Sequence, residues 1–236
     1  MSDTSDKRTP VFSLTLLACD VAREAAASTA EVLRSASSKS QQIVKEAEVS
    51  LDHMDREIDD RVTEALTAGA SKNARELLAC MKAMVDIERI GDLLVSVCNT
   101  ATTIQGHIAA EDAENLTRMA SVLEQMLVSS KAALENSDLQ PVTGLLRADE
   151  ELDRLRNITL MRHLDGAIES PRRDSIHVVF IAQALERAGD HAKNMGETVA
   201  HLVGGKSVRH LGSGNQRSIE QMYLDHLRTR GTPPQK

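Results

Sequence analysis

Two short acidic segments of this chain share one residue pattern and could bind a cation. Glu88 and Asp92 belong to the segment Ile-Glu-Arg-Ile-Gly-Asp, and Glu186 and Asp190 hold the same places in Leu-Glu-Arg-Ala-Gly-Asp, 98 positions later. Side chains four residues apart lie on one face of an α-helix. Carboxylates gathered on one face repel each other unless water screens them or a cation binds them.

The same offset of 98 positions relates further acidic residues about 30 residues upstream. It places Asp55 on Asp153 and Asp59 on Asn157, without a gap. We infer that the chain is a duplicated unit in which each copy carries one set of candidate metal ligands. The first set is Asp52, Asp55, Asp59, Glu88 and Asp92, and the second is Asp149, Asp153, Asn157, Glu186, Asp190 and Asn194.

The chemistry of these sets favours a hard cation. If the two helices of a copy lie antiparallel, four or five carboxylate oxygens face one point, which suits magnesium, calcium, manganese or iron more than a soft metal. The second set is less acidic because Asn157 stands where Asp59 supplies a carboxylate. We therefore expect the second set to bind a cation more weakly, or to need a bridging anion or water.

An ordinary solvated surface is the competing interpretation of both sets. Glu186, Asp190 and Asn194 lie roughly opposite the apolar stripe of their helix, and Arg89 and Arg187 could neutralise some of the charge. A site on such a face would be shallow. His191 is a further candidate ligand, although an isolated histidine is more often structural or solvated. The mid-helix glycines at 91 and 189 indicate that a helix or a ligand approaches closely there.

The elements that must position these residues are all helices. No stretch alternates as a strand would, and the start and stop residues predict six helices, over about 11–35, 40–68, 71–105, 110–135, 137–169 and 170–204. Short connections imply antiparallel neighbours. We expect an all-α fold of two tandem three-helix bundles, covering residues 1–106 and 107–205, and a tail over 206–236 with a short helix near 219–227.

Composition agrees with a helical protein that does not bind nucleic acid. Of 236 residues 41% are hydrophobic, but aromatic residues are limited to Phe12, Phe180 and Tyr223, so the core must be aliphatic. A net charge of −7 disfavours a partner that is bound through its phosphates. Three cysteines without a Cys-x-x-Cys pair predict buried free thiols in a reducing cytoplasm, and neither a signal peptide nor a membrane span is expected.

At these residues the chain resembles the PhoU family. The two Glu-Arg-Ile/Ala-Gly-Asp segments are similar to the family's E(D)xxxD motifs, Asp55 to Asp59 is similar to the partner motif, and Val208-Arg209-His210 is similar to the family's C-terminal end. The resemblance implies a pseudo-twofold axis between the bundles. It also implies metal clusters, often of iron or zinc, at the bundle surface. Asn157, Ser96 and Leu93 depart from the family pattern.

The resemblance implies a regulatory role in the cytoplasm. A PhoU-like protein restrains phosphate uptake and phosphate-starvation signalling by contacting the ATPase or permease of a phosphate ABC transporter and a membrane sensor histidine kinase. We expect a homodimer that reaches the membrane only through its partners and holds iron, zinc, manganese or magnesium. We expect no enzymatic activity. Two alternatives stay open, a di-metal carboxylate enzyme and a helical scaffold without metal, although no histidine here follows a glutamate by three residues, as di-iron bundles require.

Overall fold

The computed structural model describes residues 9–69, 73–137, 140–164 and 172–204. These residues form long helices, and no strand occurs among them, which confirms the predicted all-α class. The helices are α1 (Pro10–Ser35), α2 (Ser38–Thr67), α3 (Ala74–Thr103), α4 (Ala110–Asn136), α5 (Gln140–Leu164) and α6 (Arg172–Gly204).

Local sequence explains the ends of the first helices. The Thr9 hydroxyl accepts a hydrogen bond from the Phe12 N–H at 3.3 Å, and Pro10 takes the first helical position, where its missing N–H costs nothing. Ser37 caps α2 in the same way by accepting from the Ser40 N–H at 3.2 Å. After α2 the chain turns at Gly69 with φ +86°, a conformation that side chains with a Cβ rarely adopt. The predicted proline start and glycine stop are confirmed.

Several predicted helix ends differ from the structure or lie outside its described residues. The predicted third helix begins near residue 71, whereas α3 begins at Ala74 after Asn73, and residues 70–72 are not described. The predicted fifth helix begins at 137 or 138, but Ser137 is the C-cap of α4, and residues 138–139 lie outside the described residues. The last five residues of this predicted helix lie outside as well, as does the Ser-Pro start predicted for the sixth. The tail over 206–236, with its short helix and the Val208-Arg209-His210 segment, lies outside as well.

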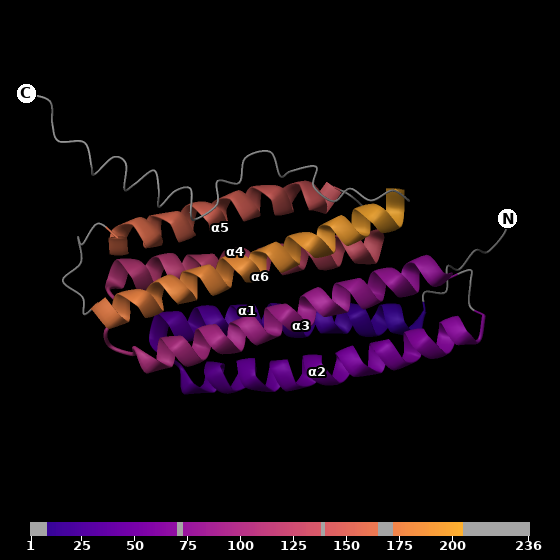
Figure 1. The fold of residues 1–236 in the computed structure, drawn as a ribbon, viewed down its shortest axis with the longest axis horizontal. Coiled ribbons are helices and arrows are strands. Elements are labelled where there is room, and N and C mark those ends of the chain that lie inside the picture. The colour runs from indigo at the N-terminus through magenta and orange to yellow at the C-terminus, as the bar shows by residue number, and fades with distance from the viewer. Residues whose placement is uncertain (1–8, 70–72, 138–139, 165–171, 205–236) are drawn as a thin grey trace, which may run out of the picture.

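The helices form two bundles packed side by side. Helices α1, α2 and α3 contact one another, as do α4, α5 and α6, and the bundles join where α1 meets α4 and α3 meets α6. Figure 1 shows α2 along one edge of the molecule, α5 along the opposite edge and the four joining helices between them. The predicted fold of two tandem three-helix bundles is confirmed, and a pseudo-twofold axis relates them.

An aliphatic core fills both bundles. Its largest fully buried side chains are leucine, isoleucine and methionine, among them Met84, Ile87, Leu94, Leu123 and Met126. All three cysteines are buried and free, as predicted. Within the described part of the chain, no helix is long and apolar enough to cross a bilayer.

The two mid-helix glycines allow the outer helices to pack closely. A Cβ on Gly91 would lie 2.9 Å from Leu51 Cδ1 of α2, and a Cβ on Gly189 would lie 2.2 Å from Leu152 Cδ1 of α5. Both separations are shorter than van der Waals contact between carbon atoms. The sequence predicted that a helix or a ligand lies close to each glycine. In both repeats it is a leucine of the adjacent helix. This close packing brings the acidic residues of α2 and α3, and those of α5 and α6, next to each other.

Candidate functional site

The first acidic set (Asp52, Asp55 and Asp59 on α2, Glu88 and Asp92 on α3) is brought together where these helices pack. Burial raises the pKa of Asp55, and the charges of Asp59 and Asp52 raise it further. Burial and then Asp92 raise the pKa of Glu88, to which Asp55 and Asp52 of the other helix also contribute. Asp55 and Asp52 of α2 therefore lie near enough to Glu88 of α3 for their charges to act on it.

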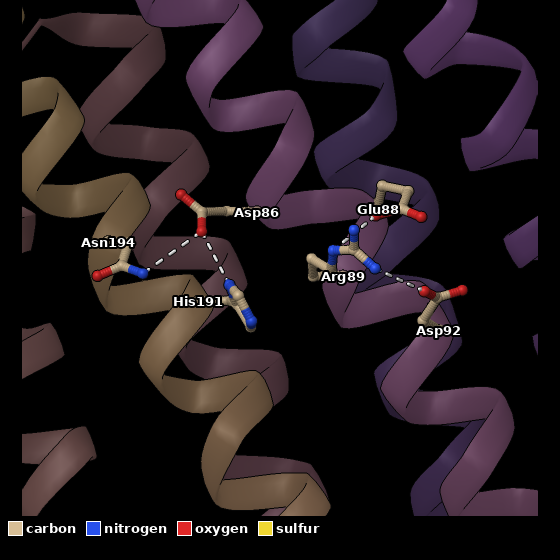
Figure 2. Close-up of polar contacts among 6 residues, drawn as sticks. All are labelled: Asp86, Glu88, Arg89, Asp92, His191 and Asn194. Carbon is tan, nitrogen blue, oxygen red and sulfur yellow. Dashed lines mark hydrogen bonds and ion pairs between the residues drawn. The ribbon is translucent and has the colours of Figure 1, made fainter.

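The arginines near the first set neutralise it weakly. Arg56 lies 3.3 Å from Asp52, and Arg89 lies 3.4 Å from Glu88 and 3.5 Å from Asp92, as Figure 2 shows for Arg89. The Arg56 and Arg89 side chains are 67% and 58% exposed. Exposed pairs of this length contribute between zero and about 1 kcal/mol, because water and salt screen them. The first set therefore keeps most of its negative charge unpaired.

The second acidic set (Asp149, Asp153 and Asn157 on α5, Glu186, Asp190 and Asn194 on α6) contains a buried arginine. The Arg156 guanidinium lies 2.6 Å from Glu186 and 3.0 Å from Asp153, and its Nε–H donates to the amide oxygen of Asn157 at 3.2 Å. The Arg156 and Glu186 side chains are only 10% and 13% exposed. Charge-assisted hydrogen bonds with little solvent around them are the strong class of polar contact in proteins.

A lysine completes the neutralisation of the second set. The Lys193 ammonium donates to Asp149 at 2.5 Å. Burial lowers the pKa of Lys193, but the hydrogen bond and charge of Asp149 outweigh it and leave this pKa raised. Burial also raises the pKa of Glu186 to about 7 against the opposing pull of Arg156, and burial and Asp149 raise that of Asp190. The second set is thus a mixed network of carboxylates and cations.

The expectation of a solvated face does not hold for Glu186. The side of α6 that carries Glu186 packs against α5 and is not exposed to water. Arg187, which sequence reasoning considered as a neutralising residue, forms no ion pair with any described residue, whereas Arg156 and Lys193 do. The offset of 98 holds for α3 and α6 and pairs Lys193 with Val95, but Leu51 and Leu152 on the two glycines set α2 and α5 at an offset of 101, which pairs Arg156 with Asp55.

Two side chains of α6, His191 and Asn194, contact the other bundle and not the carboxylates of the second set. The His191 Nδ1 lies 2.8 Å from Asp86 Oδ1 of α3, and the Asn194 amide donates to the same oxygen at 3.4 Å (Figure 2). Asp86 was not among the predicted site residues. The pair equivalent to Asp86 and His191 is Ala184 and Leu93, so only one side of the pseudo-twofold carries this polar contact. These residues join the repeats and do not face the carboxylates.

The two sets differ in how well they fit a metal ion. Nowhere in the described ranges do three acidic, histidine or cysteine side chains converge as metal ligands do. The first set nevertheless fits a hard cation in donor type and charge, because it offers five carboxylates and no buried cation. The second set does not fit, since Arg156 and Lys193 already bind its carboxylates. Metal binding by either set stays a prediction.

Comparison with known proteins identifies the family. A family model described as the PhoU domain matches residues 16–101 and again residues 116–199. The chain belongs to the PhoU family. Each match falls on one three-helix repeat, and the second includes Asp149, Asn157 and Glu186.

Named relatives and solved structures agree with this family. The chain is 27% identical over 182 residues to the phosphate-specific transport system accessory protein PhoU homolog of Pseudomonas aeruginosa, covering 72% of this chain and 73% of the relative. It is 28% identical over 163 residues to the homolog of Deinococcus radiodurans, covering 64% and 76%. The crystal structure of PhoU from Pseudomonas aeruginosa matches with a TM-score of 0.76 and 25% identity, over 83% of this chain and 96% of that one.

Proposed function

We propose that this protein is an accessory protein of a phosphate-specific transport system. It restrains phosphate uptake and phosphate-starvation signalling through contacts with the phosphate ABC transporter and a sensor histidine kinase. The observation that carries this proposal is the PhoU family match over both repeats, together with relatives that are named accessory proteins of this transport system. The protein acts in the cytoplasm as a homodimer and catalyses no reaction.

The first acidic set is the regulatory metal site in this proposal. Asp55 and Glu88 provide oxygen ligands from α2 and α3, with Asp52, Asp59 and Asp92 beside them. A bound divalent or trivalent cation, such as manganese, magnesium, iron or zinc, supplies positive charge and fixes the carboxylates relative to each other. The raised pKa values of Asp55 and Glu88 support this proposal, since burial and then neighbouring carboxylates raise them, and a cation relieves both effects. A partner that recognises this face then distinguishes the two states by charge.

A regulator without metal is the second candidate. It is favoured by the lack of three converging ligands among the described side chains. A di-metal carboxylate enzyme has no observation in its favour, because His191 contacts Asp86 and not the carboxylates, and the relatives are named for an accessory role.

The test combines metal content with phosphate control in cells. The double variant Glu88→Ala/Asp92→Ala replaces the α3 half of the first set while leaving Gly91 and the α2 contact in place. We expect it to fold, to lose bound metal and to weaken the restraint of phosphate uptake in a strain whose own copy is deleted. The matched control is Glu46→Ala/Glu57→Ala, two exposed acidic residues of α2 outside the set. Normal phosphate control by the metal-free variant would support the regulator without metal.

A further inference from the structure

The second repeat carries two cations that the first repeat lacks. Arg156 and Lys193 contact Glu186, Asp153 and Asp149, at distances between 2.5 and 3.0 Å. Matching Leu51 on Gly91 with Leu152 on Gly189 places Asp55 at the equivalent of Arg156, and Val95 stands at the equivalent of Lys193. The first set therefore has a carboxylate where the second has a guanidinium. The duplication has therefore produced two versions of one acidic motif with different counter-charges.

We propose that the Arg156 guanidinium, assisted by the Lys193 ammonium, is a built-in counter-ion of the second acidic set and makes this set independent of metal. The inference deepens the proposed function, because it confines the metal-dependent switch to the first repeat. The second set then keeps one charge state whether or not metal is present. One ion site per chain follows in place of two.

Physical chemistry favours the built-in cation over an added one. An arginine does not lose its proton in a protein, so a metal ion at Glu186 would face a fixed positive charge beside it. Arg156 is nearly buried and lies against α6, so moving it aside would break its contacts with Glu186 and Asp153 without offering it new partners. Leaving a charge buried without a partner is among the costliest changes in a protein interior.

Asn157 fits the same explanation. This residue stands next to Arg156, and its amide oxygen accepts the Nε–H of Arg156 at 3.2 Å. A neutral acceptor completes the hydrogen bonding of the guanidinium without adding a further negative charge. Arg156 and Asn157 thus form one unit that supplies the second set with its counter-charge.

The experiment replaces both counter-ions with apolar side chains. The full-length variant Arg156→Ile/Lys193→Val is titrated with Mn²⁺ in metal-free buffer, and bound metal is counted by elemental analysis after gel filtration. We expect about one more Mn²⁺ per chain than in the wild type, because Glu186, Asp153 and Asp149 lose their cations. The matched control Arg156→Lys keeps the positive charge and should gain no ion. No gain by the folded double variant would overturn the proposal, as would an equal gain by Arg156→Lys.

A second variant tests the proposal if Arg156→Ile/Lys193→Val does not fold. Glu186→Gln/Asp190→Asn removes two negative charges with little change of shape, and its Mn²⁺ count should equal that of the wild type. Loss of an ion would show that the wild-type second set binds metal and would overturn the inference. The proposed metal switch of the first repeat is tested by a different variant. It is wrong if Glu88→Gln/Asp92→Asn binds as many Mn²⁺ ions per chain as the wild type.

Discussion

The first and second repeats place the same Glu-Arg-x-Gly-Asp segment against a neighbouring helix, but they balance its charge differently. In the first repeat the nearest cations are Arg56 and Arg89, both largely exposed. In the second repeat Arg156 is nearly buried between Asp153 and Glu186. A duplicated motif can therefore keep its carboxylates on α3 and α6 and still change its chemistry through a single neighbouring position, 55 in one repeat and 156 in the other.

The same contrast appears at the contact between the repeats. Asp86 and His191 form one polar pair across α3 and α6. The equivalent residues Ala184 and Leu93 are apolar and partly buried. The pseudo-twofold relates the backbones but not these side chains. The two repeats thus share their helical architecture but differ in the side chains at the contact between them.

We expect the largest difference in stability between the repeats when one glutamate is removed from each. Glu186→Ala leaves Arg156 with Asp153 alone as its charged partner, and we expect a loss of about 2–3 kcal/mol in the free energy of unfolding. Glu88→Ala removes a repelled carboxylate, and its cost should stay below about 0.5 kcal/mol. Urea unfolding in metal-free buffer measures both. Equal losses in the two repeats would show that Arg156 does not depend on Glu186.

The two packing glycines should respond with a smaller difference. Gly189→Ala places a Cβ 2.2 Å from Leu152 Cδ1, so this buried leucine must repack, and we expect a cost of about 1–2 kcal/mol. Gly91→Ala places its Cβ 2.9 Å from Leu51 Cδ1, and the higher helix propensity of alanine offsets much of that strain. Thermal unfolding of the two variants tests the ranking. A larger loss from Gly91→Ala would mean that α2 is the more tightly held outer helix.

Making the repeat interface apolar on both sides should have a modest effect. The double variant Asp86→Ala/His191→Leu installs the residues of the equivalent pair, Ala184 and Leu93. A partly exposed polar contact at 2.8 Å is worth about 1 kcal/mol or less, so we expect a change in stability within that range. Denaturant unfolding provides the number. A loss above about 3 kcal/mol would show that this single pair holds the two bundles together.

A buried histidine of the second repeat should give the smallest effect, and only in acid. Burial lowers the pKa of His163 from its ordinary value of 6.5, against the pull of Asp112, and the equivalent residue of the first repeat is the buried Val62. The unfolded chain therefore binds the proton more readily, so the fold loses stability as pH falls below about 6.5.

Replacing this histidine isolates its share of the pH dependence. His163→Gln cannot take up a proton, so its stability should fall less steeply below pH 6.5, by less than about 1.4 kcal/mol per pH unit, the limit for one proton. The exposed His53→Gln serves as the control and should keep the wild-type slope. Parallel curves for wild type and His163→Gln would contradict the lowered pKa.

Helical periodicity and end signals were sufficient to predict the fold. Thr9, Pro10 and Gly69 act locally, so their effect on helix ends could be seen in sequence, as could the repeat at Glu88 and Glu186. The meeting of α2 with α3 also followed from antiparallel packing. The helix ends that were misplaced, as at Ala74, depend on a connection that carries weaker signals.

The counter-charges of the site could not be predicted in the same way. Arg156 lies next to Asn157 and 30 residues from Glu186, so its ion pairs depend on how α5 and α6 pack together. The partner of His191 is Asp86 in the other bundle, 105 residues away. Tertiary packing decides such pairs, and it also sets the register of α2 and α5: Leu51 and Leu152, which pack on the two glycines, are 101 positions apart and not 98.

The metal content of two double variants tests the central claim most directly. Glu88→Ala/Asp92→Ala and Glu186→Ala/Asp190→Ala remove equivalent residues from the first and second sets. After saturation with Mn²⁺ and gel filtration, the first variant should lose the metal that the wild type retains, and the second should bind as much as the wild type. An equal or larger loss from Glu186→Ala/Asp190→Ala would contradict the account.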